Sequence, residues 1–141
     1  MKDKTPPHND NAERAFLCCM LHGAVNDYGI EADDFYSRSN MRIFETINKL
    51  IDKKCAPNKT ALLTELEQSE MIEEAGGTLN INFLCDLLPS NANAEYYAGV
   101  ISECALKRSL MRIASKIARS VGETQDTRQI INGAIEELKA L

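Results

Sequence analysis

The feature that most constrains this chain of 141 residues is a long run without proline, "NANAEYYAGVISECALKRSLMRIASKIARSV", at residues 91–121. Asn91 or Asn93 can cap a helix here and Gly122 can end it, so we expect a long helix over about 93–121. A helix of about 28 residues is on the order of 40 Å long, which is more than the rest of a small domain can cover. Its far half therefore needs another partner.

The apolar residues of this predicted helix form two stripes, about a third of a turn apart. The first stripe contains Tyr97, Val100, Cys104, Met111 and Ala118, and the second contains Leu106, Leu110, Ile113, Ile117 and Val121. One partner for the long helix is the last segment, "DTRQIINGAIEELKAL". We expect a second helix there over about 126–140, capped by Asp126 or Thr127. Its apolar stripe contains Ile131, Ala134, Ile135, Leu138 and Leu141.

The short connection "GETQ" favours an antiparallel hairpin of these two helices. A hairpin of two helices cannot bury two stripes on one of them, so one stripe is left for another molecule. We expect Leu106, Leu110, Ile113 and Ile117 to pair one subunit with another. The hairpin region is predicted to span residues 91–141.

The residues before the hairpin predict an all-α fold, with residues 1–8 as a loose leader and 9–90 as a compact head of about five helices. The clearest of these helices runs from about Ser39, its expected cap, to Lys53, and carries Ile43, Phe44, Ile47, Leu50 and Ile51 at helical spacing. Other helices are expected over 9–22, after Asn58, as a short turn at Met71–Ile72, and in "NINFLCDLLPS", which Pro89 stops. The alternation in "TLNIN" is too short to indicate a strand.

Composition excludes several classes of function. A net charge of −5 argues against free nucleic-acid binding, and we interpret Lys107, Arg108, Arg112, Lys116 and Arg119 as a solvated helix face. The cysteines are odd in number, five, four of them lie in apolar helical runs, and no signal peptide precedes them, which indicates free thiols in a reducing cytoplasm. No apolar run reaches the roughly 18 residues of a membrane span.

The strongest candidate for chemistry is the acidic pair Asp33–Asp34, with Glu31 nearby. Such carboxylates can act as an acid/base pair or as metal ligands, but the sequence supplies no further converging ligand. We favour a structural interpretation, in which the pair ends a turn and Phe35 and Tyr36 are core anchors. The sequence contains neither a zinc-type cysteine spacing nor a phosphate-binding glycine loop, so we predict no catalytic, metal or cofactor site.

Four segments, in order, resemble the N-terminal domain of the bacterial DnaB-type replicative DNA helicase. The opening "PPHNDNAERAFL" is similar to that family's beginning at Pro6, Pro7, Ala12, Glu13 and Leu17. The other three segments are "DDFYSRSNMRIF", "MIEEAGG" and "PSNANAEYYAGVISECAL". The residues that mark the resemblance are Asp33, Asp34, Phe35, Tyr36, Phe44, Gly76, Gly77, Pro89, Asn93 and Tyr97.

The resemblance implies a non-catalytic collar domain whose helical hairpin protrudes from the head. It implies self-association, as a dimer or as a trimer of dimers in a hexameric ring, and docking of the C-terminal domain of primase, with a helicase loader as a further partner. Met111 and the loop around Asn80 are the expected contacts for primase or for another hairpin. ATP and Mg²⁺ would belong to a C-terminal ATPase domain with 5′–3′ helicase activity, which these residues do not contain.

Two alternatives remain at this point. The chain can be a separate protein that mimics the helicase collar and regulates a helicase or its loader. It can also be an enzyme of another type that depends on Glu31, Asp33 and Asp34.

Overall fold

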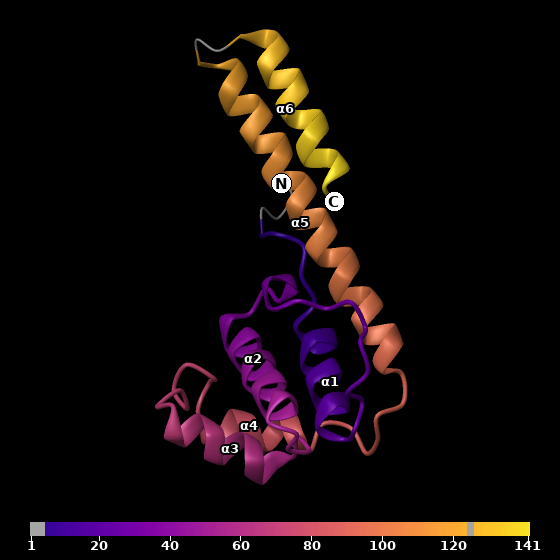
Figure 1. Ribbon diagram of the computed structural model, residues 1–141, viewed down its shortest axis with the longest axis vertical. Coiled ribbons are helices and arrows are strands. Elements are labelled where there is room, and N and C mark those ends of the chain that lie inside the picture. Colours follow the sequence, from indigo (N-terminus) through magenta and orange to yellow (C-terminus); the bar gives the residue numbers. More distant parts are fainter. Residues whose placement is uncertain (1–4, 124–125) are drawn as a thin grey trace. The chain divides into compact units, whose positions relative to one another are not determined.

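The computed structural model describes residues 5–123 and 126–141, and these contain helices and no strand. The elements are α1 (Asp10–Leu21), the 3-10 helix η1 (Ala32–Asp34), α2 (Arg38–Asp52), α3 (Lys59–Gln68), α4 (Thr78–Cys85), α5 (Ala94–Val121) and α6 (Thr127–Lys139), as shown in Figure 1. The predicted all-α class is confirmed. The chain divides into two compact units, the head (His8–Ser102) and a hairpin unit that contains Glu103–Leu141.

The core of the head surrounds α1, which is apolar on nearly all sides. Asn9 caps this helix by accepting a hydrogen bond from the Ala12 amide at 2.9 Å. Apolar residues that recur at helical spacing on α2, α3, α4 and the first turns of α5 complete the core. Its fully buried or nearly buried members include Phe16, Leu17, Ile43, Ile47, Leu62, Leu66, Ile81, Leu84, Ala98 and Ile101.

The loop before α2 places one of its two aromatic residues inside the head. Phe35 is buried, and its ring centroid lies 4.8 Å from that of Phe44. The expectation that Tyr36 is also a core anchor is wrong, because its side chain is 41% exposed and its ring stacks on His8 with centroids 4.1 Å apart. The backbone of Phe35 is extended, and neighbouring side chains of an extended segment point to opposite sides.

A buried carboxylate fixes this loop to α1. Glu13 is 2% exposed and accepts hydrogen bonds from the Tyr36 amide at 2.8 Å, the Ser37 amide at 3.3 Å and the Asn40 side-chain amide at 3.0 Å. These donors lie at the N-terminus of α2, where the helix dipole favours a negative charge. Ser37, and not Ser39 as predicted, caps α2, because the helix begins at Arg38 and places Ser39 in its first turn.

The segment between α3 and α4 forms turns, and the short helical turn predicted at Met71–Ile72 corresponds to one helix-type hydrogen bond, from the Ala75 amide to the Met71 carbonyl at 3.0 Å. The last residue of these turns is Gly76, which has a φ of +93°. A Cβ atom at this position would overlap with the side chain of Asn80. The Asn80 amide donates to the Ala75 carbonyl at 2.8 Å and accepts from the Arg14 guanidinium at 2.6 Å, which connects α4 with α1.

An ion-pair cluster joins α2 to α3. The Glu65 carboxylate lies 2.8 Å from Lys49 Nζ and 3.0 Å from Lys53 Nζ. The hydrogen bond from Lys49, followed by that from Lys53, lowers the pKa of Glu65 below its ordinary value of 4.5, although burial opposes the change. The carboxylate form is therefore the one that the folded head favours.

Stability near Glu65 is expected to depend on pH. Because its pKa is lower in the folded than in the unfolded state, its contribution is present above pH 4.5 and is lost as the pH falls through the folded-state pKa. We compare the free energies of unfolding in urea of Glu65→Gln and Glu67→Gln at a series of pH values from 6 downward. At pH 6 the Glu65→Gln variant should be the less stable of the two, and at the most acidic pH the two variants should be equally stable. A constant difference between the two variants would contradict this assignment.

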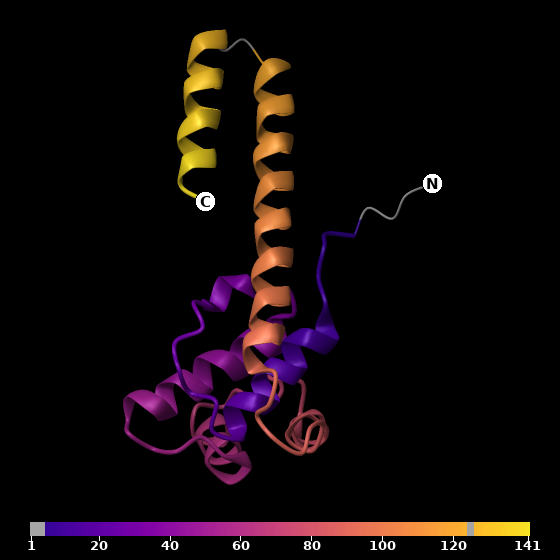
Figure 2. The same cartoon turned by 90° about the vertical axis from the view of Figure 1, so that its right-hand side faces the viewer.

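In the hairpin unit, α5 and α6 run side by side in opposite directions, as both Figure 1 and Figure 2 show. Asp126 caps α6, accepting a hydrogen bond from the Arg128 amide at 3.0 Å. Part of the predicted "GETQ" connection, residues 124–125, lies outside the described residues.

Candidate protein-interaction surface

Asp34 of the acidic pair supports a turn, while Asp33 is exposed. Asp34 accepts a hydrogen bond from the Glu31 amide at 2.8 Å, and the Glu31 side chain accepts one from the backbone of residue 34, so the two form a capping box around η1. Within residues 5–123 and 126–141, no three His, Cys, Asp or Glu side chains lie close enough together to hold a metal ion. Asp34 and Glu31 thus have a structural role in this turn.

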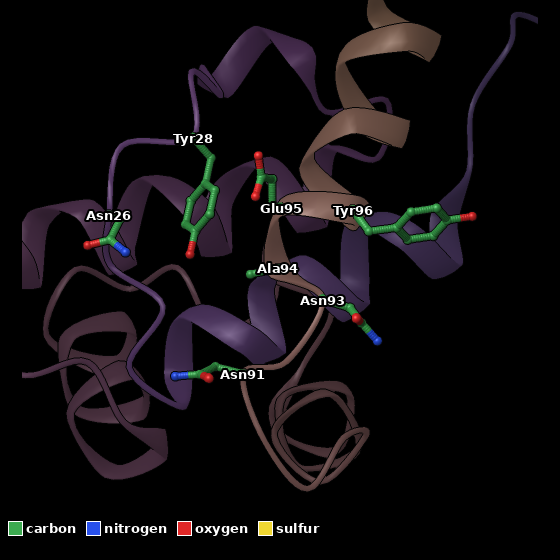
Figure 3. Close-up of a pocket in the computed structure, with 7 residues that line it drawn as sticks. All are labelled: Asn26, Tyr28, Asn91, Asn93, Ala94, Glu95 and Tyr96. Atoms are coloured by element: carbon green, nitrogen blue, oxygen red, sulfur yellow. The ribbon is translucent and has the colours of Figure 1, made fainter.

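A depression of about 680 Å³ on the head is polar and open. Figure 3 shows that its side chains do not converge, since Tyr96 and Asn93 point away from Tyr28. The Asn91 amide is already used, donating to the His22 carbonyl at 3.0 Å. A catalytic site needs groups that meet at a reacting atom, and this arrangement supplies none. The lining residues are Asn26, Tyr28, Asn91, Asn93, Ala94, Glu95 and Tyr96.

Three of the five cysteines serve as small core residues. Cys18, Cys19 and Cys85 are buried, and Cys18 and Cys19 lie near the backbone carbonyls of Cys85 and Ala92, both at 3.6 Å. Burial raises the pKa of the Cys85 thiol to about 11 and also raises that of Cys19. Because the thiolate is the reactive form, these side chains are poor nucleophiles.

The groove between α5 and α6 contains part of the surface that the sequence assigned to subunit pairing. Ile113 is 5% exposed and Ile117 is half-buried, and both line this groove opposite Ile130 and Ala134. At its edge, Lys116 Nζ forms an ion pair with Glu137 at 2.6 Å. Ile113 and Ile117 therefore pack toward α6 within the hairpin.

The outer side of the hairpin retains exposed apolar residues. On α5 these are Leu106, Leu110 and Met111, which are 40%, 44% and 46% exposed. On α6 they are Ile131, Ile135 and Leu138, which are 41–45% exposed and recur at the i, i+4, i+7 spacing of one helix face. We call these three residues the α6 stripe. Sequence reasoning treated Ala134 as part of the same stripe, whereas the structure places it against α5.

A second exposed apolar surface lies on α4 in the head, and sequence reasoning did not identify it. Leu79 and Phe83 are 67% and 64% exposed, and Leu87, just after the helix, is 46% exposed. We call these residues the α4 face. A signal was present in the sequence, because positions 79, 83 and 87 repeat every four residues beside the buried set Ile81, Leu84 and Cys85. Asn80, predicted to lie in a loop, is part of α4, and its side chain is engaged with Arg14.

The residues that marked the resemblance have structural roles in the head. Phe35 and Phe44 lie in the core, Gly76 and Gly77 have positive φ angles, and Asn93 has a φ of +67° immediately before α5. Tyr97 packs against the core from the first turn of α5. Pro89 follows α4 and is exposed.

Among the described residues, none of the helices combines the length and the apolar content that a bilayer crossing requires.

The comparisons with known proteins agree with this architecture. Residues 5–103 match the model of the DnaB-like helicase N terminal domain. The replicative DNA helicase DnaB of Treponema pallidum is 32% identical over 98% of this chain and 33% of its own length. The replicative DNA helicase DnaC of Bacillus subtilis is 31% identical over 84% of this chain and 27% of its own length. The chain thus spans about a third of the length of these curated relatives.

Solved structures show the same fold. The N-terminal domain of DnaB helicase from Mycobacterium tuberculosis superposes with a TM-score of 0.88 at 24% identity, over 97% of this chain and 100% of that chain. A DnaB-like replicative helicase, solved in a study of its interactions with primase, gives a TM-score of 0.76 at 22% identity, over 94% of this chain and 31% of that chain. The match of the family model over most of the chain, and the similarity to these helicases, show that the chain belongs to the family of DnaB-like helicase N-terminal domains.

Proposed function

We propose that this chain is a non-catalytic docking domain, which joins the subunits of a replicative helicase in a hexameric ring and presents a surface to primase. The observation that supports this most directly is the set of exposed apolar side chains on the α6 stripe and the α4 face. Exposed apolar residues grouped on one surface mark sites of protein association. In this proposal, ATP hydrolysis and strand separation belong to a C-terminal domain outside these residues.

Subunit pairing is assigned to the outer side of the hairpin. The α6 helix already packs Ile130 and Ala134 toward α5, so the α6 stripe lies on a different side of the same helix. Two hairpins that place these stripes together would form a four-helix arrangement with an apolar centre. Leu106 and Leu110 on α5 are also exposed, and we assign them to subunit pairing together with the α6 stripe.

Primase docking is assigned to the α4 face, with Met111 as a second candidate. Leu79 and Phe83 are the most exposed large apolar side chains of α4, and the core of the head does not use them. Asn80 contributes indirectly, because its bonds to Arg14 and to Ala75 fix the orientation of α4. A helix held from behind in this way is a pre-organised surface, which lowers the entropic cost of binding.

The experiment for subunit pairing compares two variants of α6. The triple variant Ile131→Ser, Ile135→Ser, Leu138→Ser should reduce the mass measured by sedimentation equilibrium to that of a monomer, since it removes the apolar contact. The control Asn132→Ser, Glu136→Ser changes exposed polar residues of the same helix and should leave the mass unchanged. Circular dichroism reports whether helicity is kept. An unchanged mass for the triple variant would overturn the assignment.

The primase assignment is measured by calorimetric titration with the C-terminal domain of primase. Leu79→Ser, Phe83→Ser should weaken binding by about tenfold or more, because it removes two exposed anchors. Its mass in sedimentation should equal that of the wild-type chain. Tyr96→Ser, which alters another exposed aromatic residue of the head, is the matched control. Equal affinities for the two variants would exclude the α4 face.

A further inference from the structure

Charge is distributed unevenly between the two units. The head, residues 8–102, contains 15 acidic and 7 basic residues, a formal charge of −8. Residues 103–141 contain 7 basic and 5 acidic residues, a formal charge of +2. The net charge of −5 conceals this difference. Opposite charge on two surfaces of one chain favours contact between copies.

The positive charge is concentrated on α5. Residues 107–119 contain five Lys or Arg and no Asp or Glu. Four of them recur every three to four residues along one face of α5 and span about 16 Å. We call these four residues the basic ridge: Arg108, Arg112, Lys116 and Arg119. Lys116 pairs with Glu137, whereas Arg112 and Arg119 have no carboxylate within ion-pair distance among the described residues.

The complementary charge lies at the end of α3 and in the following turn. Residues 65–74, "ELEQSEMIEE", contain five Glu and no Lys or Arg. Glu65 is held by Lys49 and Lys53, and Glu74 lies 3.1 Å from Arg42. The remaining three, Glu67, Glu70 and Glu73, are exposed, and within the described part of the chain no cation pairs with them. We call these three the acidic segment.

We propose that the basic ridge of one copy docks on the acidic segment of a second copy. This inference rests on the proposed self-association and adds to it an electrostatic contact that differs from the apolar one. The two surfaces are different, so the contact is heterologous, and such contacts can extend an assembly beyond the dimer that one self-complementary stripe produces. Each surface offers side chains that lack an intramolecular ion pair, which is the condition for an ionic contact between copies.

A nucleic acid is the less favoured occupant of the ridge. The ridge residues are interspersed with Ser109 and Ser115, and no aromatic side chain lies within residues 107–119 on which bases could stack. A head with a formal charge of −8 would also repel phosphates. A protein surface with spaced carboxylates does not require stacking.

The test is a charge exchange between two variants of the whole chain. Variant one is Arg112→Glu, Arg119→Glu, and variant two is Glu67→Lys, Glu73→Lys. Each variant alone places like charges together at the contact. Raising the salt from about 0.1 M to about 1 M shortens the screening length from about 10 Å to about 3 Å and weakens ionic contacts. The mass of each variant at about 0.1 M salt should therefore equal the mass of the wild type at about 1 M salt. An equimolar mixture restores opposite charges at both contacts, and should recover the wild-type mass at low salt. We expect each variant alone to associate through this contact at least about tenfold more weakly.

The controls are charge changes at other exposed positions. Arg128→Glu and Glu95→Lys change an exposed charge of each unit elsewhere and should leave the salt dependence intact. A wild-type mass that does not depend on salt, or a mixture that does not recover, would overturn the inference. A fluorescent 20-nucleotide strand tests the other occupant. If the wild-type chain binds the strand, only variant one loses this binding, and the mass of variant two is unchanged, the ridge is assigned to nucleic acid. The α6 triple variant is read at about 1 M salt, so the apolar contact is judged independently.

Discussion

Glu13→Ala is expected to lower the free energy of unfolding by about 3 kcal/mol, because two backbone amides and the Asn40 side chain lose their shared acceptor. Glu13 is almost completely buried, so water cannot easily replace the carboxylate. The donors belong to the loop and first turn of α2, and this variant should therefore loosen the entry to that helix. Urea unfolding monitored by circular dichroism measures the change.

Two further variants separate the acceptor from the charge. Glu13→Gln keeps one oxygen but directs an NH₂ group at other donors, so it should recover only part of the lost stability. Asp33→Ala removes an exposed carboxylate of η1, and its effect should remain within about 0.5 kcal/mol. If Glu13→Ala proves as mild as Asp33→Ala, the carboxylate does not hold the loop.

Gly76→Ala is expected to destabilise the head by about 2–4 kcal/mol. The backbone has a φ of +93°, where a side chain is strained, and the added Cβ would lie 2.5 Å from Asn80 Nδ2 and 3.2 Å from Asn80 Cβ. Asn80 would have to move away from the Ala75 carbonyl and from Arg14, losing two hydrogen bonds. Thermal unfolding measures the total cost.

Gly29→Ala isolates the backbone strain. Gly29 also has a positive φ, +72°, but no atom lies within 4 Å of the added Cβ. Its cost should be about 1 kcal/mol. Similar values for the two variants would mean that the contact with Asn80 contributes little to the position of α4.

The helices themselves could be predicted because their periodicity is local. Ile43, Phe44 and Ile47 recur on one face whatever the rest of the chain does, and α2 lies where that pattern indicated. The errors arose where a distant residue decides the local structure. The Glu13 carboxylate accepts a hydrogen bond from the Tyr36 amide, 23 residues away along the chain. Arg14 donates a hydrogen bond to the Asn80 side chain, 66 residues away. No local pattern contains that information.

The candidate surface could be predicted in kind but only in part of its residues. The surplus of apolar residues on residues 93–121 indicated association, yet Ile113 and Ile117 line the groove with α6 while Leu106 and Leu110 remain exposed. Which residues of a two-sided helix become covered depends on the rotation and register of its neighbour. These follow from the packing of whole side chains, and spacing alone does not determine them.

By itself, the sequence determined the all-α class, the approximate positions of the helices and the resemblance to the helicase family, since all of these depend on residues close together in the chain or on motifs in order. The tertiary structure alone decided which apolar residues stay in solvent. Ile131, Ile135 and Leu138 remain exposed because α6 presents Ile130 and Ala134 to α5. Leu79 and Phe83 remain exposed because α4 has apolar residues on two sides and its neighbours α1 and α3 cover only one.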